Sequence, residues 1–257
     1  MLAASNVVFV HGMYMTGDSW SDWVDLFQER GYACHAPSWP HHEGQPSVLR
    51  TNPPADLRTL TLPQVVDAYR ELVAGLDEPP LLVGHSMGGL VVQILLAEGL
   101  GAAGVAIDSA PPKGVSILSI PFLRANAGIF GDPDHAINPT LEEWTYGWAG
   151  GLKATEAYAL WSQHVVPESK RVGKGPTTQD ARVDFSVERA PLLLVAGGED
   201  RTIPARLNKK NHRAWGKSPS RTDRVVFEDR GHSLVIDSGW EDVADAVLEW
   251  YDELQEE

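Results

Sequence analysis

The chain has 257 residues, of which 43% are apolar and 22% are charged, a mixture typical of a globular domain that buries its own core. Collagen-like and disordered chains are excluded by this composition, and no run of about 20 apolar residues is present to span a membrane. The formal net charge of −14 would repel phosphate backbones, so we expect no nucleic-acid partner.

Cysteine usage favours a cytoplasmic protein. Cys34 is the only cysteine, so no intrachain disulfide can form. The first residues also lack the basic segment of a secretory signal peptide. We therefore expect a cytoplasmic location, and the sequence leaves the oligomeric state open between a monomer and a homodimer.

Short apolar runs alternate with amphipathic segments of helix length. Residues 19–30, 62–76, 89–100 and 242–254 have the spacing of helices. The apolar runs are typical of strands, at residues 7–10, 34–38, 81–83, 105–107, 192–196 and 224–228, and the first has the pattern of a strand buried on both faces. Strands separated by helices predict an α/β fold, with a mostly parallel central sheet and flanking helices.

Roughly 80 residues separate the fourth and fifth expected strands, far more than a crossover needs. Residues 113–187 are rich in glycine, proline and aromatics. We predict a helical cap insertion over one end of the sheet, within a single domain of residues 1–257 whose core is 1–112 and 188–257. The end of the insertion, 168–184, is polar and predicted to be a surface loop. Residues 39–60 are predicted to be irregular.

A glycine-rich turn follows the expected strand at 81–83. Its sequence is Gly84-His85-Ser86-Met87-Gly88, and a helical run follows directly. A strand, Gly-x-Ser-x-Gly and a helix together raise a serine hydroxyl at the carboxyl end of a sheet, beside the N–H groups of the helix. The pattern alone also occurs by accident, but in this context it indicates Ser86 as a nucleophile.

A serine nucleophile needs a base and an acid that orients the base. Asp200 directly follows the fifth expected strand, and His232 follows the sixth. Both lie where open α/β sheets gather their active sites. Glu199 and Asp108 are alternative acids, because Glu199 adjoins Asp200 and Asp108 follows the fourth expected strand.

Several segments in order resemble the α/β-hydrolase superfamily, in its compact single-domain branch of esterases and lipases. The resemblance covers nearly the whole chain, through Val8 to Gly12, Gly84 to Gly89, Gly197 to Pro204 and Gly231-His232. It implies the α/β-hydrolase fold, with Ser86, Asp200 and His232 as catalytic triad. The family shares a fold without sharing one reaction, so the substrate stays open.

The resemblance also implies an oxyanion hole made by the backbone N–H groups of Met13 and Met87. Relatives commonly carry Asp-x-Pro-Gly-His-Gly after the second strand, and this chain departs from that pattern around His41 and His42. We interpret that pair as part of a solvated loop, since no further spacing supports a zinc site. An apolar substrate pocket is expected from six aromatic side chains: Trp39, Phe122, Phe130, Trp144, Trp148 and Trp161.

These features predict a carboxylesterase-like serine hydrolase that cleaves an ester of a small to medium apolar substrate through an acyl-enzyme on Ser86. No metal or organic cofactor is expected, and the partner is the small-molecule ester. A hydroxynitrile lyase, a lactonase or a carbon–carbon hydrolase would use the same triad. A non-catalytic receptor for a small ligand is a further alternative.

Overall fold

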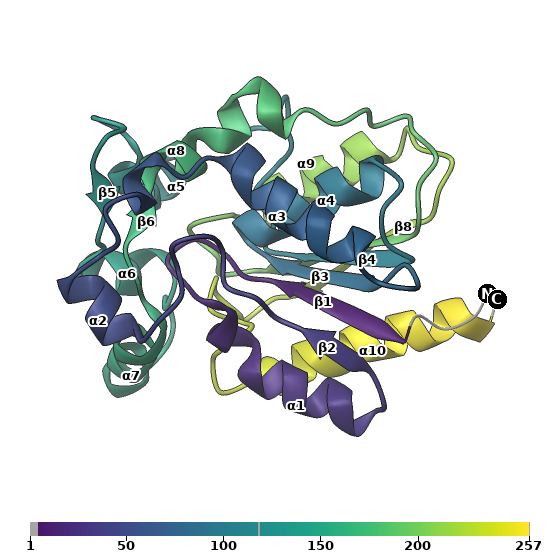
Figure 1. Cartoon of the computed structure of the whole chain (residues 1–257), viewed down its shortest axis with the longest axis horizontal. Helices are drawn as coiled ribbons and strands as arrows, with labels where there is room; N and C mark the ends of the chain where they lie inside the picture. Colours follow the sequence, from purple (N-terminus) through teal and green to yellow (C-terminus); the bar gives the residue numbers. More distant parts are fainter. Residues whose placement is uncertain (1–4, 118, 257) are drawn as a thin grey trace.

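A computed structural model describes residues 5–117 and 119–256, and six parallel strands form its centre (Figure 1). The strand order is β2-β1-β3-β4-β7-β8, with every neighbouring pair parallel. The strands are β1 (Asn6–Val10), β2 (Ala33–His35), β3 (Leu81–His85), β4 (Ala103–Ile107), β7 (Leu192–Gly197) and β8 (Thr222–Phe227).

The inner strands are apolar because both of their faces are covered. Every residue of β3, β4 and β7 is buried, which explains why these strands show no alternation of polar and apolar residues. The mostly parallel sheet with flanking helices predicted from the sequence is therefore confirmed. The expected strand at 34–38 is shorter and starts one residue earlier, at Ala33.

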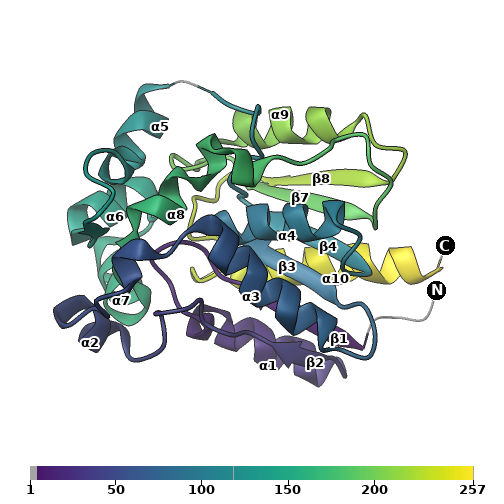
Figure 2. The same ribbon diagram turned by 45° about the horizontal axis from the view of Figure 1, so that its top comes forward.

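Helices cover the two faces of the sheet (Figure 2). On one face, α3 (Leu62–Ala74), α4 (Met87–Ala97) and α9 (Ala205–Trp215) pack in one apolar cluster. On the other face, α1 (Ser21–Glu29) and α10 (Trp240–Glu256) pack in a second cluster. Because α4 lies under the centre of the sheet, its apolar residues are buried all round.

Most of the long connection from β4 to β7 forms a layer beyond the carboxyl ends of the strands, at the left of Figure 1. A third apolar cluster, which includes Met15, Trp144 and Val165, joins this layer to the loop after β1. Its regular elements are α5 (Ile120–Ala125), β5 (Ala136–Ile137), α6 (Leu141–Gly147), α7 (Ala154–His164), β6 (Glu168–Ser169) and α8 (Lys170–Lys174).

The prediction of a surface loop at 168–184 is wrong. Glu168 and Ser169 are fully buried in β6, which pairs with β5 in a two-stranded antiparallel sheet. Val172 and Ala181 are also fully buried. The polar composition of this segment misled the prediction because its buried polar groups find partners far away in the sequence.

Residues 39–60 contain more structure than expected. Here α2 (Pro46–Thr51) lies against α7, and Arg50 donates hydrogen bonds to the carbonyl oxygens of Trp161, Ser162 and Val165. These bonds add a side-chain donor at the carboxyl end of α7, where the last carbonyl oxygens of a helix lack intrahelical donors. The remaining short 3-10 helices are η1 (Gly17–Trp20), η2 (Leu57–Thr59), η3 (Ala127–Ile129), η4 (Gly175–Thr177) and η5 (Gln179–Ala181).

None of the helices in the described part of the chain is long and apolar enough to cross a membrane.

Candidate active site

Ser86 is the single residue between the end of β3 at His85 and the start of α4 at Met87. Its backbone has φ 54° and ψ −118°, a conformation that costs a non-glycine residue free energy. The neighbouring glycines permit the turn: a Cβ on Gly84 would lie 2.3 Å from the carbonyl oxygen of Gly88, and one on Gly88 would lie 2.1 Å from that of Val10. The strained turn directs the Ser86 hydroxyl out of the sheet.

The structure brings the three predicted triad side chains together. The Ser86 hydroxyl lies 2.9 Å from Nε2 of His232, and Nδ1 of the same ring lies 2.6 Å from Oδ2 of Asp200. Because Nδ1 faces a carboxylate, it carries the ring proton, which leaves Nε2 free to accept the serine proton. The arrangement can therefore activate a hydroxyl nucleophile.

Asp200 is held in place by the loop that follows β7. Its other oxygen, Oδ1, accepts hydrogen bonds from the backbone N–H groups of Thr202 at 2.7 Å and Ile203 at 2.8 Å. Asp200 is 4% exposed, whereas Glu199, the adjacent alternative acid, faces solvent. The carboxylate that reaches the imidazole is thus the one predicted.

The base is covered by the cap. His232 is fully buried, and the ring of Trp148 packs edge-on against its ring at a centroid distance of 4.4 Å. The ring of His85 also contacts it, 4.7 Å away, and Nε2–H of His85 donates to the His232 carbonyl oxygen. Water is largely excluded from the imidazole, which strengthens its hydrogen bonds to Ser86 and Asp200.

The expected oxyanion-hole residues flank the nucleophile. Met87 is the first residue of α4, so its N–H has no acceptor within the helix. The backbone before Met13 also lies close to the serine, because a Cβ on Gly12 would lie 3.0 Å from Cβ of Ser86. A developing negative charge at Ser86 would therefore meet the amino-terminal end of a helix dipole.

A cavity of about 280 Å³ lies in the cap, and Trp148 of its wall contacts the triad residue His232. Tyr14 and Trp148 belong to its wall, together with Arg124 and Glu142. Of the six aromatic residues expected in a pocket, two line this cavity, Trp144 and Trp148. The other four lie elsewhere: Trp39 is buried against His11, Phe122 packs on the core, Phe130 is exposed, and Trp161 stacks on Arg50.

His42 is not part of a solvated loop, contrary to the prediction. Its side chain is 1% exposed, and its Nε2 lies 3.1 Å from Oε2 of the buried Glu168. Burial alone would lower the pKa of His42, but the carboxylate of Glu168 overrides this effect and raises it. This pair leaves no pattern in the sequence, because its members lie 126 positions apart.

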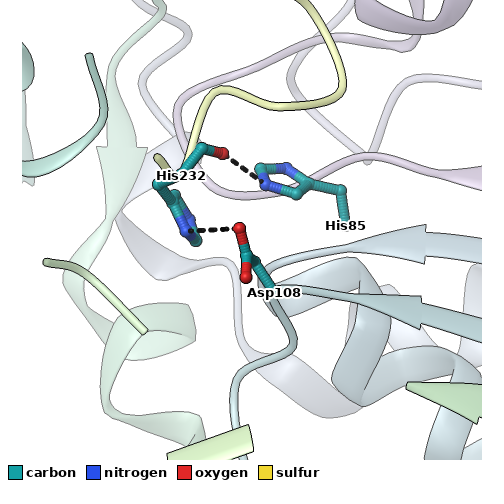
Figure 3. A group of neighbouring side chains, drawn as sticks. All are labelled: His85, Asp108 and His232. Atoms are coloured by element: carbon teal, nitrogen blue, oxygen red, sulfur yellow. Dashed lines mark hydrogen bonds and ion pairs between the residues drawn. The ribbon is translucent and has the colours of Figure 1, made fainter. Parts of the chain in front are cut away.

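Asp108, the other alternative acid, also lies beside His232 (Figure 3). Among the described residues, one group of three potential metal ligands has its donor atoms within 4.8 Å of one another: His85, Asp108 and His232. Both ring nitrogens of His232 already face Ser86 and Asp200. His232 therefore has no ring nitrogen left for a metal ion, and we assign no metal site to this group.

The sequence matches the profile of the alpha/beta hydrolase family over residues 7–246, and the chain belongs to that family. No curated protein matches it in sequence.

Several solved structures have the same fold at low sequence identity. A methylesterase from Arabidopsis is 16% identical with a TM-score of 0.68, over 96% of this chain and 98% of that one. An extracellular alpha/beta-hydrolase from a Paenibacillus species is 16% identical with a TM-score of 0.70, over 95% and 98%. A monoacylglycerol lipase from Paleococcus ferrophilus is 18% identical with a TM-score of 0.66, over 96% and 93%. At these identities the similarity establishes the fold.

Proposed function

We propose that the protein is a serine hydrolase that cleaves a carboxylic ester through an acyl-enzyme on Ser86. The observation that carries the proposal is the continuous chain of hydrogen bonds from Ser86 through His232 to Asp200, with distances of 2.9 and 2.6 Å. It combines a nucleophile, a base and an orienting carboxylate in one buried site, as acyl transfer requires.

In the proposed mechanism, His232 takes the proton from the Ser86 hydroxyl as its oxygen attacks the ester carbonyl carbon. The tetrahedral intermediate carries its negative charge on the former carbonyl oxygen, which the N–H groups of Met13 and Met87 stabilise. His232 then gives its proton to the leaving alcohol, and the acyl group stays on Ser86. Water, deprotonated by His232, releases the acid in a second round.

The cap cavity supports a small to medium apolar substrate. Its volume of about 280 Å³ is at the lower end of small-molecule sites. Aromatic and aliphatic side chains make up much of its wall, and one of them, Trp148, also contacts His232. Methylesterase and monoacylglycerol lipase structures share the fold, which supports an ester as the bond cleaved. With one cysteine and a mechanism that needs no cofactor, we favour a cytoplasmic enzyme.

Ser86→Ala tests the proposal on a panel of aryl esters of graded acyl length. We expect kcat to fall by at least about 10⁴-fold, since loss of a nucleophile removes the covalent pathway. Ser162→Ala, which changes an exposed serine of α7, is the matched control and should behave as the wild type. A fluorophosphonate probe should label Ser86 in the wild type and leave the Ser86→Ala variant unlabelled.

Two results would contradict the proposal. Full ester cleavage by Ser86→Ala would remove the nucleophile from the mechanism. Labelling of Ser86 without cleavage of any ester would instead leave the machinery intact and point to another reaction of the same triad, such as cyanohydrin cleavage.

A further inference from the structure

A second carboxyl group points at the imidazole of His232. Asp108 follows β4, the strand beside β7, and its side chain is fully buried. Its Oδ2 lies 3.9 Å from Nδ1 of His232, and Figure 3 shows this oxygen directed at the ring. Within the described part of the chain, no donor is hydrogen-bonded to this oxygen. A buried carboxylate oxygen without a donor is costly, so its state needs an explanation.

The backbone fixes the direction of this side chain. Asp108 has φ 41°, in the left-handed region that aspartate tolerates better than most residues. Its N–H donates to the carbonyl oxygen of Val195 at 2.8 Å, and its Oδ1 accepts from the N–H of Gly197 at 2.7 Å. The two hydrogen bonds and the backbone angle thus hold Asp108 against β7, with its Oδ2 facing His232.

The two carboxyl groups around His232 differ in how well they bear a negative charge. Asp200 accepts two backbone N–H bonds and the imidazole N–H, whereas Asp108 accepts one backbone N–H bond. Burial raises the pKa of the Asp108 carboxyl well above its usual range, and the adjacent charge and hydrogen bonding of Asp200 raise it further. Oδ2 of both carboxyls faces the same ring nitrogen of His232, at 2.6 Å from Asp200 and 3.9 Å from Asp108. Two buried carboxyls this close are expected to share one proton, and it belongs on Asp108, the one with fewer N–H donors.

None of the other titratable groups nearby favours an ionised Asp108. His85, from β3, has a pKa held well below its usual value by burial and by His232, so it is neutral. Asp237, before α10, adds negative charge near Asp108 but is paired with Arg230 at 3.0 Å. His11, behind His85, is also neutral because burial lowers its pKa.

We propose that Asp108 is a positioning residue of the triad, a neutral carboxylic acid that donates a hydrogen bond to Asp200 and holds that carboxylate against His232. The inference rests on the proposed function, because it assigns a role within the same triad. The bond draws charge from Asp200, so His232 binds its proton less tightly and the triad stays active to lower pH. The proton remains on Asp108 throughout the reaction.

Asp108→Ala and Asp108→Asn test this role through the pH dependence of kcat/KM. In Asp108→Ala the donor is lost. We then expect the acid limb of the pH profile, where kcat/KM falls as His232 is protonated, to move to higher pH by about one unit, a tenfold change in proton affinity. In Asp108→Asn the amide keeps both a donor toward Asp200 and an acceptor for Gly197. The limb should therefore return to within about 0.3 unit of its wild-type position. Asp245→Asn, an exposed change on α10, controls for net charge.

Asp108→Asn alone decides the question if Asp108→Ala does not fold. An ionised Asp108 would stabilise the imidazolium, so its neutralisation by asparagine would move the acid limb to lower pH and overturn the proposal. Equal limbs in wild type, Asp108→Ala and Asp108→Asn would also overturn it, because Asp108 would then have no effect on the base.

A second measurement separates this inference from the proposed function. The Nδ1 proton of His232, hydrogen-bonded to Asp200, is expected to give a low-field proton NMR signal whose titration needs no turnover. If no ester is cleaved and Ser86 is not labelled, the proposed function fails, yet the same shifts between variants in this titration would still establish the role of Asp108.

Discussion

The backbone of Ser86 stores strain at the position of the proposed nucleophile. With φ 54° and ψ −118°, this residue occupies a region that glycine enters easily and other residues at a cost of about 1–3 kcal/mol. Both Ser86→Gly and Ser86→Ala remove the hydroxyl, but only glycine also removes the strain. We expect Ser86→Gly to have a free energy of unfolding about 1 kcal/mol higher than Ser86→Ala, after the larger chain entropy of unfolded glycine is subtracted.

Urea denaturation of the two variants measures this difference. Gly216→Ala is a control with ordinary backbone angles, since Gly216 has φ −61° and ψ −1°. Equal stability of Ser86→Gly and Ser86→Ala would mean that the turn holds no strain at Ser86.

At the scale of single residues, the sequence identified side chains that belong to local patterns. Ser86 was found from its glycines, and Asp200 and His232 from their places after strands, because the carboxyl ends of parallel strands meet at one edge. Asp108 was considered only as a substitute for Asp200, since nothing in the sequence indicates that two carboxyls share one imidazole. The partner of His42 was missed for the same reason, because a contact across the fold leaves no local pattern.

At the scale of elements, the buried ion pair of His42 and Glu168 connects the cap strand β6 to the loop after β2. The pKa of His42 is raised in the folded protein, so the folded state holds this proton more tightly than the unfolded chain does. The resulting stability is fully present below the ordinary histidine pKa of about 6.5 and is lost as pH rises through the higher, folded value. His42→Gln should therefore lower the free energy of unfolding most at acidic pH, by about 3 kcal/mol.

Denaturation of wild type and His42→Gln between pH 6 and pH 9 gives the comparison. The difference between the two proteins should narrow as the pH rises, and a widening difference would contradict the pairing. In the double variant His42→Gln with Glu168→Gln no buried carboxylate is left unpaired, so part of the lost stability should return.

The position of a strand or helix can be predicted from the sequence where the element is long or fully buried, and less well in the cap. A continuous apolar run such as Leu81-Leu82-Val83 indicates an inner strand without help from distant contacts. The cap is built from helices of 5–11 residues and two-residue strands. Segments this short carry too little periodicity to specify a structure alone. Their conformation depends on distant contacts, such as the hydrogen bonds of Arg50 to the end of α7.

At the scale of the whole molecule, the cap encloses the triad, since Ser86 is 6% exposed and His232 is fully buried. Trp148 lies between His232 and the cap cavity. Trp148→Leu should open this passage and raise kcat/KM for long acyl chains relative to short ones by about tenfold, the effect of about 1.4 kcal/mol. Tyr158→Leu, an exposed position on α7, is the control and should leave the ratio of the two rates unchanged.

The steady-state ratio of long-chain to short-chain ester cleavage measures the change. A uniform fall in kcat/KM for all esters would show that Trp148 supports His232 without selecting the substrate.

The nucleophile and its base stand 146 positions apart in the chain. Ser86 belongs to the part of the core that precedes the cap, and both Asp200 and His232 belong to the part that follows it. The first part lacks the base and the second lacks the nucleophile. A nascent chain should therefore cleave no ester until its last strand has joined the sheet. A chain cut at Gly151, an exposed glycine with open space around it, would hydrolyse ester only where the two pieces have found each other. Because the triad is divided between the two pieces, ester cleavage would report their assembly.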